Sequence, residues 1–243
     1  MPNPTAAMLV IGDEILSGRT RDANMHFLAG ALTGHGISLQ EVRIVMDDHA
    51  AIVAALNALR AGFDHVFTSG GIGPTHDDIT ADAVAAAFAV PIDVRDDARA
   101  ILAERCERVG IDLNEARLRM ARIPQGATLI DNPVSGAPGF RIGNVYVMAG
   151  VPNIFQAMVA SVLPTLTGGA PLLSQSLRVN RAEGEIAGPL RDLAAEFDDL
   201  SFGSYPFVRD GAYGANIVVR GSDGARLDAA MVRLQALFPG AIR

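Results

Sequence analysis

The sequence predicts an α/β fold: a three-layer, doubly wound domain with a mainly parallel sheet, followed by a small α+β domain. Two observations lead to this prediction. Short continuous apolar runs, such as residues 6–11, are typical of strands that are covered on both faces. These runs alternate with segments of helical periodicity, and that order implies right-handed crossovers between parallel strands, with helices on both sides of the sheet.

The first third of the chain follows this alternation closely. Glycines at 34 and 36 end the first long helical segment, as glycines often do after a helix. The expected elements are strands at 6–11, 38–46 and 64–68 and helices at 24–33, 50–61 and 81–87.

The middle of the chain is less regular, because turn-forming residues crowd the segment 132–139. A hairpin is expected around Gly143 and Asn144. The expected elements are helices at 96–109, 114–122 and 154–166 and strands at 128–130, 140–142 and 145–148.

A domain boundary is expected at residues 168–171, which read Gly-Gly-Ala-Pro. It separates a first domain of residues 1–168 from a second of residues 172–243. The second domain has no glycine-rich phosphate loop. Its expected elements are strands at 172–179 and 215–220, helices at 186–197 and 225–238, and a turn at 203–206.

The composition indicates a cytoplasmic protein. The 243 residues are 49% hydrophobic, enough for a substantial core, and the net charge is −7 without a long basic run, which argues against nucleic acid as the main partner. The one cysteine, Cys106, excludes an internal disulfide. The apolar run at 6–11 has no basic segment before it and is too short to span a membrane, so neither a signal peptide nor a membrane partner is expected.

The most informative segment is TSGGIGPTHDDIT at residues 68–80. It lies between a strand end and a helix start, where glycines let a ligand approach the bare backbone N–H groups. Backbone amides at Gly70, Gly71 and Gly73 are candidates to hold a phosphate group, and Thr75 adds a hydroxyl donor. The segment therefore predicts a site for a phosphorylated ligand.

Four aspartates that follow predicted strand ends indicate a divalent cation beside this loop. They are Asp13, Asp47, Asp77 and Asp78, and together they carry more negative charge than a phosphate site tolerates without a cation. Carboxylate oxygens suit Mg²⁺ in particular. Other interpretations stay open: Asp13, together with Glu14, and Asp47 can each cap a helix, and the Asp77–Asp78 pair can be favoured by a helix dipole.

Four motifs, in this order and spacing, resemble one known family. They are GDEIL at 12–16, SGGIGPTHDDIT at 69–80, NPVSGAPGF at 132–140 and AGVPN at 149–153. They are similar to the MoaB/Mog-type molybdopterin-binding domain, in the version of the competence/damage-inducible protein A (CinA) family and of the N-terminus of eukaryotic FAD synthase. The resemblance covers residues 6–166, and GSYP at 203–206 resembles the small domain that follows. A C-terminal amidase domain, which full-length members carry, is not expected in a sequence that ends at Arg243.

The resemblance implies a metal-dependent nucleotide diphosphate hydrolase that acts on ADP-ribose, FAD or a related diphosphate. Asp13, Asp47 and Asp78 are then the expected ligands of Mg²⁺, or of Co²⁺ or Mn²⁺. Asp47, Asp77, Asp78 and His76 are the candidate catalytic residues, although His76 can equally be a phosphate donor or a spacer. The expected ligand-binding residues are Gly12, Asp13, Glu14, Ser69, Gly70, Gly71, Gly73, Pro74, Thr75, Ser135, Gly136, Ala137, Pro138, Gly150 and Pro152.

Two further functions stay open at this point. One is a module that binds a pterin or a nucleotide without turnover. The other is adenylyl transfer to molybdopterin, which is disfavoured because His76 and Asp77 stand where that branch carries a basic residue. MoaB/Mog domains commonly form trimers, whereas members of this branch are more often dimers, so a homodimer is expected.

Overall fold

The computed structural model describes residues 3–209 and 211–242 and divides the chain into two compact units. The first is Met1–Gly169 and the second is Ala170–Arg243. Among the described residues, no helix is both long and apolar enough to cross a membrane.

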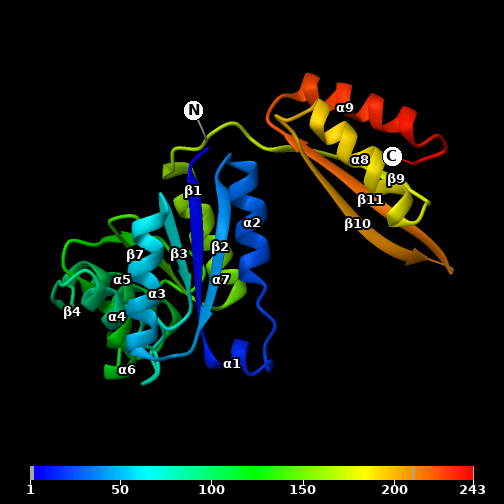
Figure 1. The fold of residues 1–243 in the computed structure, drawn as a ribbon. Coiled ribbons are helices and arrows are strands. Elements are labelled where there is room, and N and C mark those ends of the chain that lie inside the picture. The colour runs from blue at the N-terminus through cyan, green and yellow to red at the C-terminus, as the bar shows by residue number, and fades with distance from the viewer. Residues whose placement is uncertain (1–2, 210, 243) are drawn as a thin grey trace. The chain divides into compact units, whose positions relative to one another are not determined.

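The first unit is built on a six-stranded sheet with the order β2-β1-β3-β8-β7-β6. The pairs β2–β1, β1–β3 and β3–β8 are parallel, whereas β8–β7 and β7–β6 are antiparallel, which confirms the mainly parallel sheet. Figure 1 shows β1, β2 and β3 side by side. The strands are β1 (Thr5–Ile11), β2 (Ser38–Val45), β3 (His65–Ser69), β6 (Thr128–Ile130), β7 (Gly139–Ile142) and β8 (Val145–Met148).

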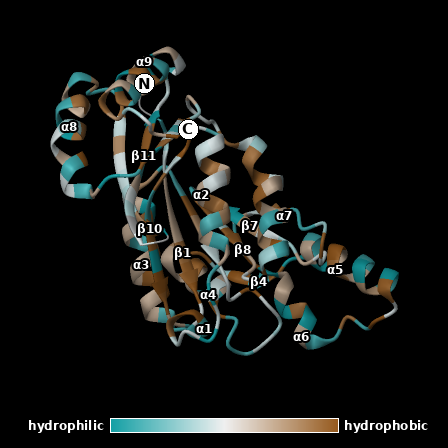
Figure 2. Cartoon of the chain, turned by 90° about the vertical axis from the view of Figure 1, so that its right-hand side faces the viewer, coloured by the Kyte–Doolittle hydropathy of each residue, from teal (hydrophilic) through white to brown (hydrophobic). Residues whose placement is uncertain are grey.

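Side chains on the two faces of β1 enter two different hydrophobic cores. Leu9 lies in the core that includes α3 and α4, and Met8 lies in the core that includes α2 and α7. β1 is apolar from Ala6 to Ile11 (Figure 2), because a strand covered on both faces has no solvent side. The long helices are α2 (Asn24–Gly34), α3 (His49–Gly62), α4 (Thr80–Ala87), α5 (Asp96–Val109) and α7 (Pro152–Val162).

The expected helix at 114–122 is wrong in its second half. The chain forms one helical turn, α6, then a short 3₁₀ turn, and at Arg122 it becomes a strand. That strand pairs with β4, and Arg122 makes a bidentate ion pair with Asp82 of α4 at 2.6 and 2.7 Å. Tertiary pairing therefore overrides local helical propensity. The short elements are α1 (Asp13–Leu16), β4 (Ile92–Val94), α6 (Glu115–Leu118), η1 (Arg119–Ala121), β5 (Arg122–Pro124) and η2 (Leu163–Thr165).

The second unit is a three-stranded antiparallel sheet, β10-β11-β9, with a core shared by its two helices. The expected turn at 203–206 is wrong, because these residues lie inside β10 and pair with β11. Pro206 is compatible with this strand since β10 is an edge strand and needs fewer backbone donors. The elements are β9 (Leu173–Val179), α8 (Glu183–Glu196), β10 (Ser201–Arg209), β11 (Ala212–Gly221) and α9 (Gly224–Leu237).

Candidate functional site

A cavity of about 570 Å³ opens at the ends of β1, β3 and β8, where the loops that follow these parallel strands meet. This edge is where open α/β sheets generally bind ligands. The lining residues are Ile11, Gly12, Glu14, Thr20, Asp47, Gly70, Gly71, Ile72, Gly73, Pro74, Asp77, Asp78, Met120, Asn132, Ser135, Ala137, Ala149, Gly150, Val151, Pro152 and Ile154.

We call the segment 68–80 the glycine loop. Its first two glycines are required by the backbone conformation and by the lack of room for a side chain. Gly70 and Gly71 have φ values of 109° and 68°. A Cβ atom on Gly70 would collide with the carbonyl of Ile11, and one on Gly71 would collide with the hydroxyl of Thr80. The loop is therefore packed directly against β1 and the start of α4, with its backbone facing the cavity.

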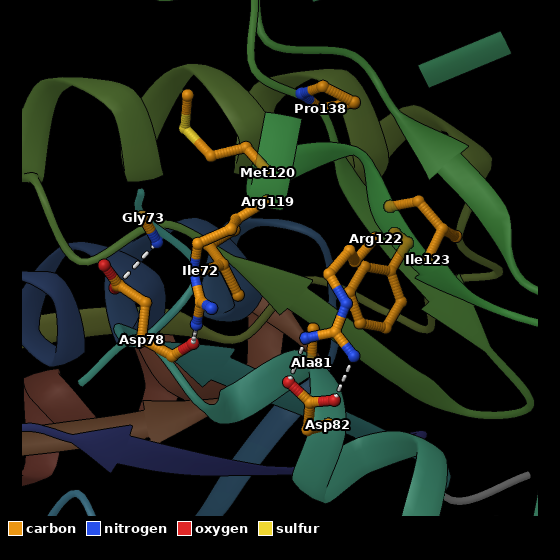
Figure 3. Close-up of a pocket in the computed structure, with 12 residues that line it drawn as sticks. Ile72, Gly73, Asp78, Ala81, Asp82, Arg119, Met120, Arg122, Ile123 and Pro138 are labelled. Carbon is orange, nitrogen blue, oxygen red and sulfur yellow. Dashed lines mark hydrogen bonds and ion pairs between the residues drawn. The ribbon is translucent and has the colours of Figure 1, made fainter. Parts of the chain in front are cut away.

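The Asp78 carboxylate holds the rest of this loop in shape. It accepts hydrogen bonds from the Gly73 amide at 2.7 Å, the Thr75 amide at 2.8 Å and the Thr75 hydroxyl at 2.5 Å. Figure 3 shows the carboxylate directed at Gly73, with Arg119 near the Asp78 carbonyl. Asp78 thus has a clear structural role, and its role as a metal ligand stays a prediction.

Asp13 and Asp47 connect the loops that follow β1 and β2. The Asp13 amide donates to the Asp47 carboxylate at 3.0 Å, and the Asp47 amide donates to the Asp13 carboxylate at 3.4 Å. Burial raises the pKa of Asp47, and the nearby charges of Asp13, Glu14 and Asp77 raise it further, against the opposing hydrogen bond from Asp13. Burial and the acidic neighbours together disfavour the ionised form of the Asp47 carboxyl in the ligand-free protein.

His76 and Asp77 lie at the exposed tip of the glycine loop. The His76 side chain is fully exposed and its Nδ1 lies 3.9 Å from Asp77, outside the lining of the cavity. Hydrogen bonding to the Thr75 side chain lowers the pKa of Asp77, which borders the cavity as an ionised carboxylate.

The buried Asn24 links two walls of the cavity. Its amide nitrogen donates to the Ser69 hydroxyl at 2.8 Å and to the Gly150 carbonyl at 2.7 Å. These bonds join the glycine loop to the loop after β8. The Asn24 Oδ1 atom is buried and has no hydrogen-bond partner among the residues that the structure describes.

A third wall is formed by the loop at 132–139, which is held by bonds within itself. The amide of Asn132 donates to the Ser135 hydroxyl at 2.6 Å and to the Ala137 carbonyl at 2.7 Å. Its Oδ1 accepts from the amides of Val134 and Ser135.

A smaller hollow of about 20 Å³, the size of about one water molecule, adjoins the cavity behind the glycine loop. It contains the Asp82–Arg122 ion pair, in which the guanidinium faces both carboxylate oxygens (Figure 3). Within the described part of the chain, the buried Nε of Arg119 has no hydrogen-bond partner. This hollow lies against the glycine loop and is too small for a ligand of nucleotide size.

The structure brings most of the expected site residues to the cavity, but six of them lie outside its lining. These six are Asp13, Ser69, Thr75, His76, Gly136 and Pro138. The sequence reasoning missed an apolar wall, because such side chains are read as core. Its members are Ile11, Ile72, Met120, Val151 and Ile154.

Among the described residues, no three His, Cys, Asp or Glu side chains are placed to hold a metal ion together. The residues present nevertheless fit Mg²⁺, which is usually held by one or two protein carboxylates together with substrate phosphates and water. Glu14, Asp47 and Asp77 border the cavity, so one or two carboxylates are available there to such a cation.

Comparisons with known proteins give a family match for each of the two units. Residues 7–168 match the family described as "Probable molybdopterin binding domain", and residues 171–243 match "FAD synthase, middle domain". A probable FAD synthase of Caenorhabditis elegans is 32% identical over 98% of this chain and 50% of its own length. A CinA-like protein of Citrifermentans bemidjiense is 40% identical over 67% of this chain and 40% of its own length. The chain thus spans about half the length, or less, of these curated relatives.

A crystal structure of the protein CinA, titled as having unknown function, from Thermoplasma acidophilum has a TM-score of 0.62 to this chain and is 34% identical. It covers 68% of this chain, and the match includes 99% of that structure. The fold, the matched segments and these relatives agree with the four sequence motifs. The chain therefore belongs to the molybdopterin-binding domain family, in its CinA-like form, and carries a second unit of the FAD synthase middle-domain type.

Proposed function

We propose that the first unit hydrolyses a nucleotide diphosphate, of the ADP-ribose or FAD class, with the help of a divalent cation such as Mg²⁺. The observation that supports this most is the charge of the cavity. Its lining holds four carboxylates, from Glu14, Asp47, Asp77 and Asp78, and among the described residues it holds no arginine or histidine. The chain has no lysine at all. A phosphorylated ligand in this cavity needs a cation from solution.

The shape of the cavity supports a nucleotide. A volume of about 570 Å³ is in the range of small-molecule sites. The apolar wall of Ile72, Met120 and Ile154 offers a surface for an aromatic ring. The backbone N–H group of Gly71 in the glycine loop is offered to a phosphate. The cavity therefore provides separate places for a heterocycle and a diphosphate.

Each of these residues has a different role in the proposed reaction. Of the three loop amides expected to contact a phosphate, those of Gly70 and Gly73 already donate to the Met148 carbonyl and the Asp78 carboxylate, which keep the loop in position. The Gly71 amide is the proposed phosphate contact. Asp77 is the ionised carboxylate available to orient a water molecule for in-line attack. A bound divalent cation supplies neutralisation of the charge that develops on the phosphate oxygens. Asp47 and Glu14 are its proposed protein ligands.

A second candidate is binding of a pterin or nucleotide without turnover. The match of residues 7–168 to the family described as "Probable molybdopterin binding domain" supports it. The relatives named FAD synthase also bring adenylyl transfer into consideration.

One screen distinguishes these functions. The purified chain is incubated with ADP-ribose, FAD and other nucleotide diphosphates, with Mg²⁺, Mn²⁺, Co²⁺ or a chelator, and products are identified by mass spectrometry. Hydrolysis is expected only with a cation. A nucleotide that binds in calorimetry but is never cleaved would support the binding module, and AMP transfer to a pterin would support the transferase.

The matched variants are Asp47→Asn and Asp48→Asn. Asp47 borders the cavity, whereas the neighbouring Asp48 caps α3 by accepting from the Ala51 amide at 2.8 Å. Asparagine is also a good N-cap, so Asp48→Asn is expected to behave like the wild type. Asp47→Asn is expected to lower kcat by about 100-fold or more, as when one electrostatic contributor is lost. Equal activities of the two variants would exclude Asp47 from the reaction.

A further inference from the structure

The free edge of the six-stranded sheet carries apolar side chains that are exposed to solvent. Val42 and Ile44 of β2 are 38% and 43% exposed, and Met46, just beyond the strand, is 52% exposed. Val42 and Ile44 pair with the buried Met8 and Val10 of β1, so they extend the apolar surface of the sheet outward. We call these three residues the β2 edge patch.

The backbone of β2 is also unpaired along this edge. The Gly12 amide donates to the Val45 carbonyl at 3.1 Å, so Val45 directs its backbone groups toward β1. In a parallel ladder alternate residues bond to opposite neighbours, and Val42 and Ile44 therefore direct their N–H and C=O groups away from β1. Among the described strands, none pairs with β2 on that side. Such an edge is a template for another strand.

We propose that β2 pairs in antiparallel fashion with β2 of a second copy of this chain, about a two-fold axis at Arg43. This register places Val42 opposite the partner's Ile44 on both sides of the axis. The N–H and C=O groups of Val42 and Ile44 then make four hydrogen bonds across the interface, because these residues form hydrogen-bonded pairs. The side chains of the β2 edge patch are covered at the same time.

Other registers are less favourable. In a register shifted by one residue, the free backbone groups of Val42 and Ile44 face partner residues whose own groups already bond to β1. The shift also places side chains of opposite sheet faces across from each other. A centre at Val42 places Ile44 opposite Gln40, where the ladder with β1 is irregular between Leu39 and Glu41. The two-fold axis at Arg43 avoids both problems.

The charges beside the axis complement each other in this register. Arg43 forms an ion pair with Glu41 of its own strand at 2.6 Å, and both side chains are nearly two-fifths exposed. Across the axis Arg43 lies directly opposite the partner's Arg43, which by itself is unfavourable. It also lies diagonal to the partner's Glu41, within reach of long side chains, and this opposite charge offsets the repulsion. Two arginines and two glutamates thus form a group without net charge. An isologous contact of this kind closes on itself as a dimer.

The mass of the particle in solution tests the interface. Light scattering is expected to give a dimer for the wild type and a monomer for Ile44→Asp, with the dimer dissociation constant raised at least 100-fold. The matched control is Ile101→Asp on α5, where the side chain is 40% exposed, and it should stay dimeric. A monomeric or trimeric wild type, or a dimeric Ile44→Asp variant with native circular dichroism, would overturn the proposal.

Disulfide trapping tests the register. Directly opposite residues of a non-hydrogen-bonded pair have Cα atoms about 4.5 Å apart, within disulfide range. Arg43→Cys should therefore form covalent dimers under mild oxidation. Glu41→Cys is the matched control, since it lies two residues away on the same strand face and has no Glu41 opposite it. The native Cys106 is only 5% exposed, so its background is low. Trapping through Glu41→Cys and not through Arg43→Cys would contradict this arrangement.

Discussion

Gly71 shows at the scale of one residue how the site depends on the absence of a side chain. Its backbone has a positive φ and the Thr80 hydroxyl occupies the space where a Cβ atom would lie. Gly18 has a similar φ of 72° but has no atom within 4 Å of that position. Substitutions at these two glycines therefore distinguish the energetic cost of backbone strain from that of steric crowding.

Gly71→Ala is expected to lower the free energy of unfolding by about 3 kcal/mol, because strain and overpacking add. Gly18→Ala should lower it by about 1 kcal/mol, from strain alone. Urea denaturation of both variants measures the difference. Equal losses would show that the glycine loop relaxes around a new side chain.

Asp78→Asn is the residue-scale test of the glycine loop. An amide replaces one oxygen that accepts hydrogen bonds from Gly73 or Thr75, so the loop loses part of its support. Turnover is expected to fall by about 100-fold or more, on the scale of a lost preorganised contributor. Nucleotide binding should weaken much less, since the carboxylate otherwise repels phosphate. Steady-state rates and calorimetric affinities test this, and wild-type turnover would remove Asp78 from the mechanism. Thr75→Ala, which removes only one donor, is the milder comparison.

At the scale of elements, the loops that follow β1 and β2 bring acidic side chains close together, and this lowers the stability of the ligand-free protein. The pKa of Asp47 is raised in the folded state by burial and by its acidic neighbours. The contribution of such a group to stability is fully present below the unfolded-state pKa and is lost as pH rises through the folded-state pKa.

Asp47→Asn should therefore raise the melting temperature of the metal-free protein at pH 7. The asparagine side chain of this variant can still accept the hydrogen bond from the Asp13 amide. The advantage of the variant over the wild type should shrink as pH falls toward 4, and added Mg²⁺ should reduce it at pH 7. Thermal melts between pH 4 and 7, with chelator or Mg²⁺, measure this. A variant that is less stable than the wild type at pH 7 would argue against a negative potential at this site.

Sequence patterns predicted the strands and helices of the first unit well where both faces of a strand are buried, as in β1 and β3. They failed at 114–122 and 203–206, where pairing with β4 and β11 decides the conformation. For the site, they found the glycine loop, whose residues are contiguous. Met120 escaped them because only the folded chain brings it to the cavity.

At the scale of the whole molecule, the two units have separate hydrophobic cores. The cavity is lined entirely by residues of the first unit. The fragment 1–169 is therefore expected to fold and to keep nucleotide binding, measured by calorimetry, within about tenfold of the full chain. A folded fragment that binds no nucleotide would show that the second unit completes the site.

The buried amide of Asn24 has a mechanical consequence for this cavity. It joins the glycine loop to the loop after β8 by two hydrogen bonds. We therefore expect these two walls of the cavity to keep a fixed position relative to each other. The loop of Asn132 is bonded chiefly to itself, so it can shift as a unit without breaking those bonds. We therefore expect ligands of different size to be accommodated by shifts of this loop, while the glycine loop keeps its geometry.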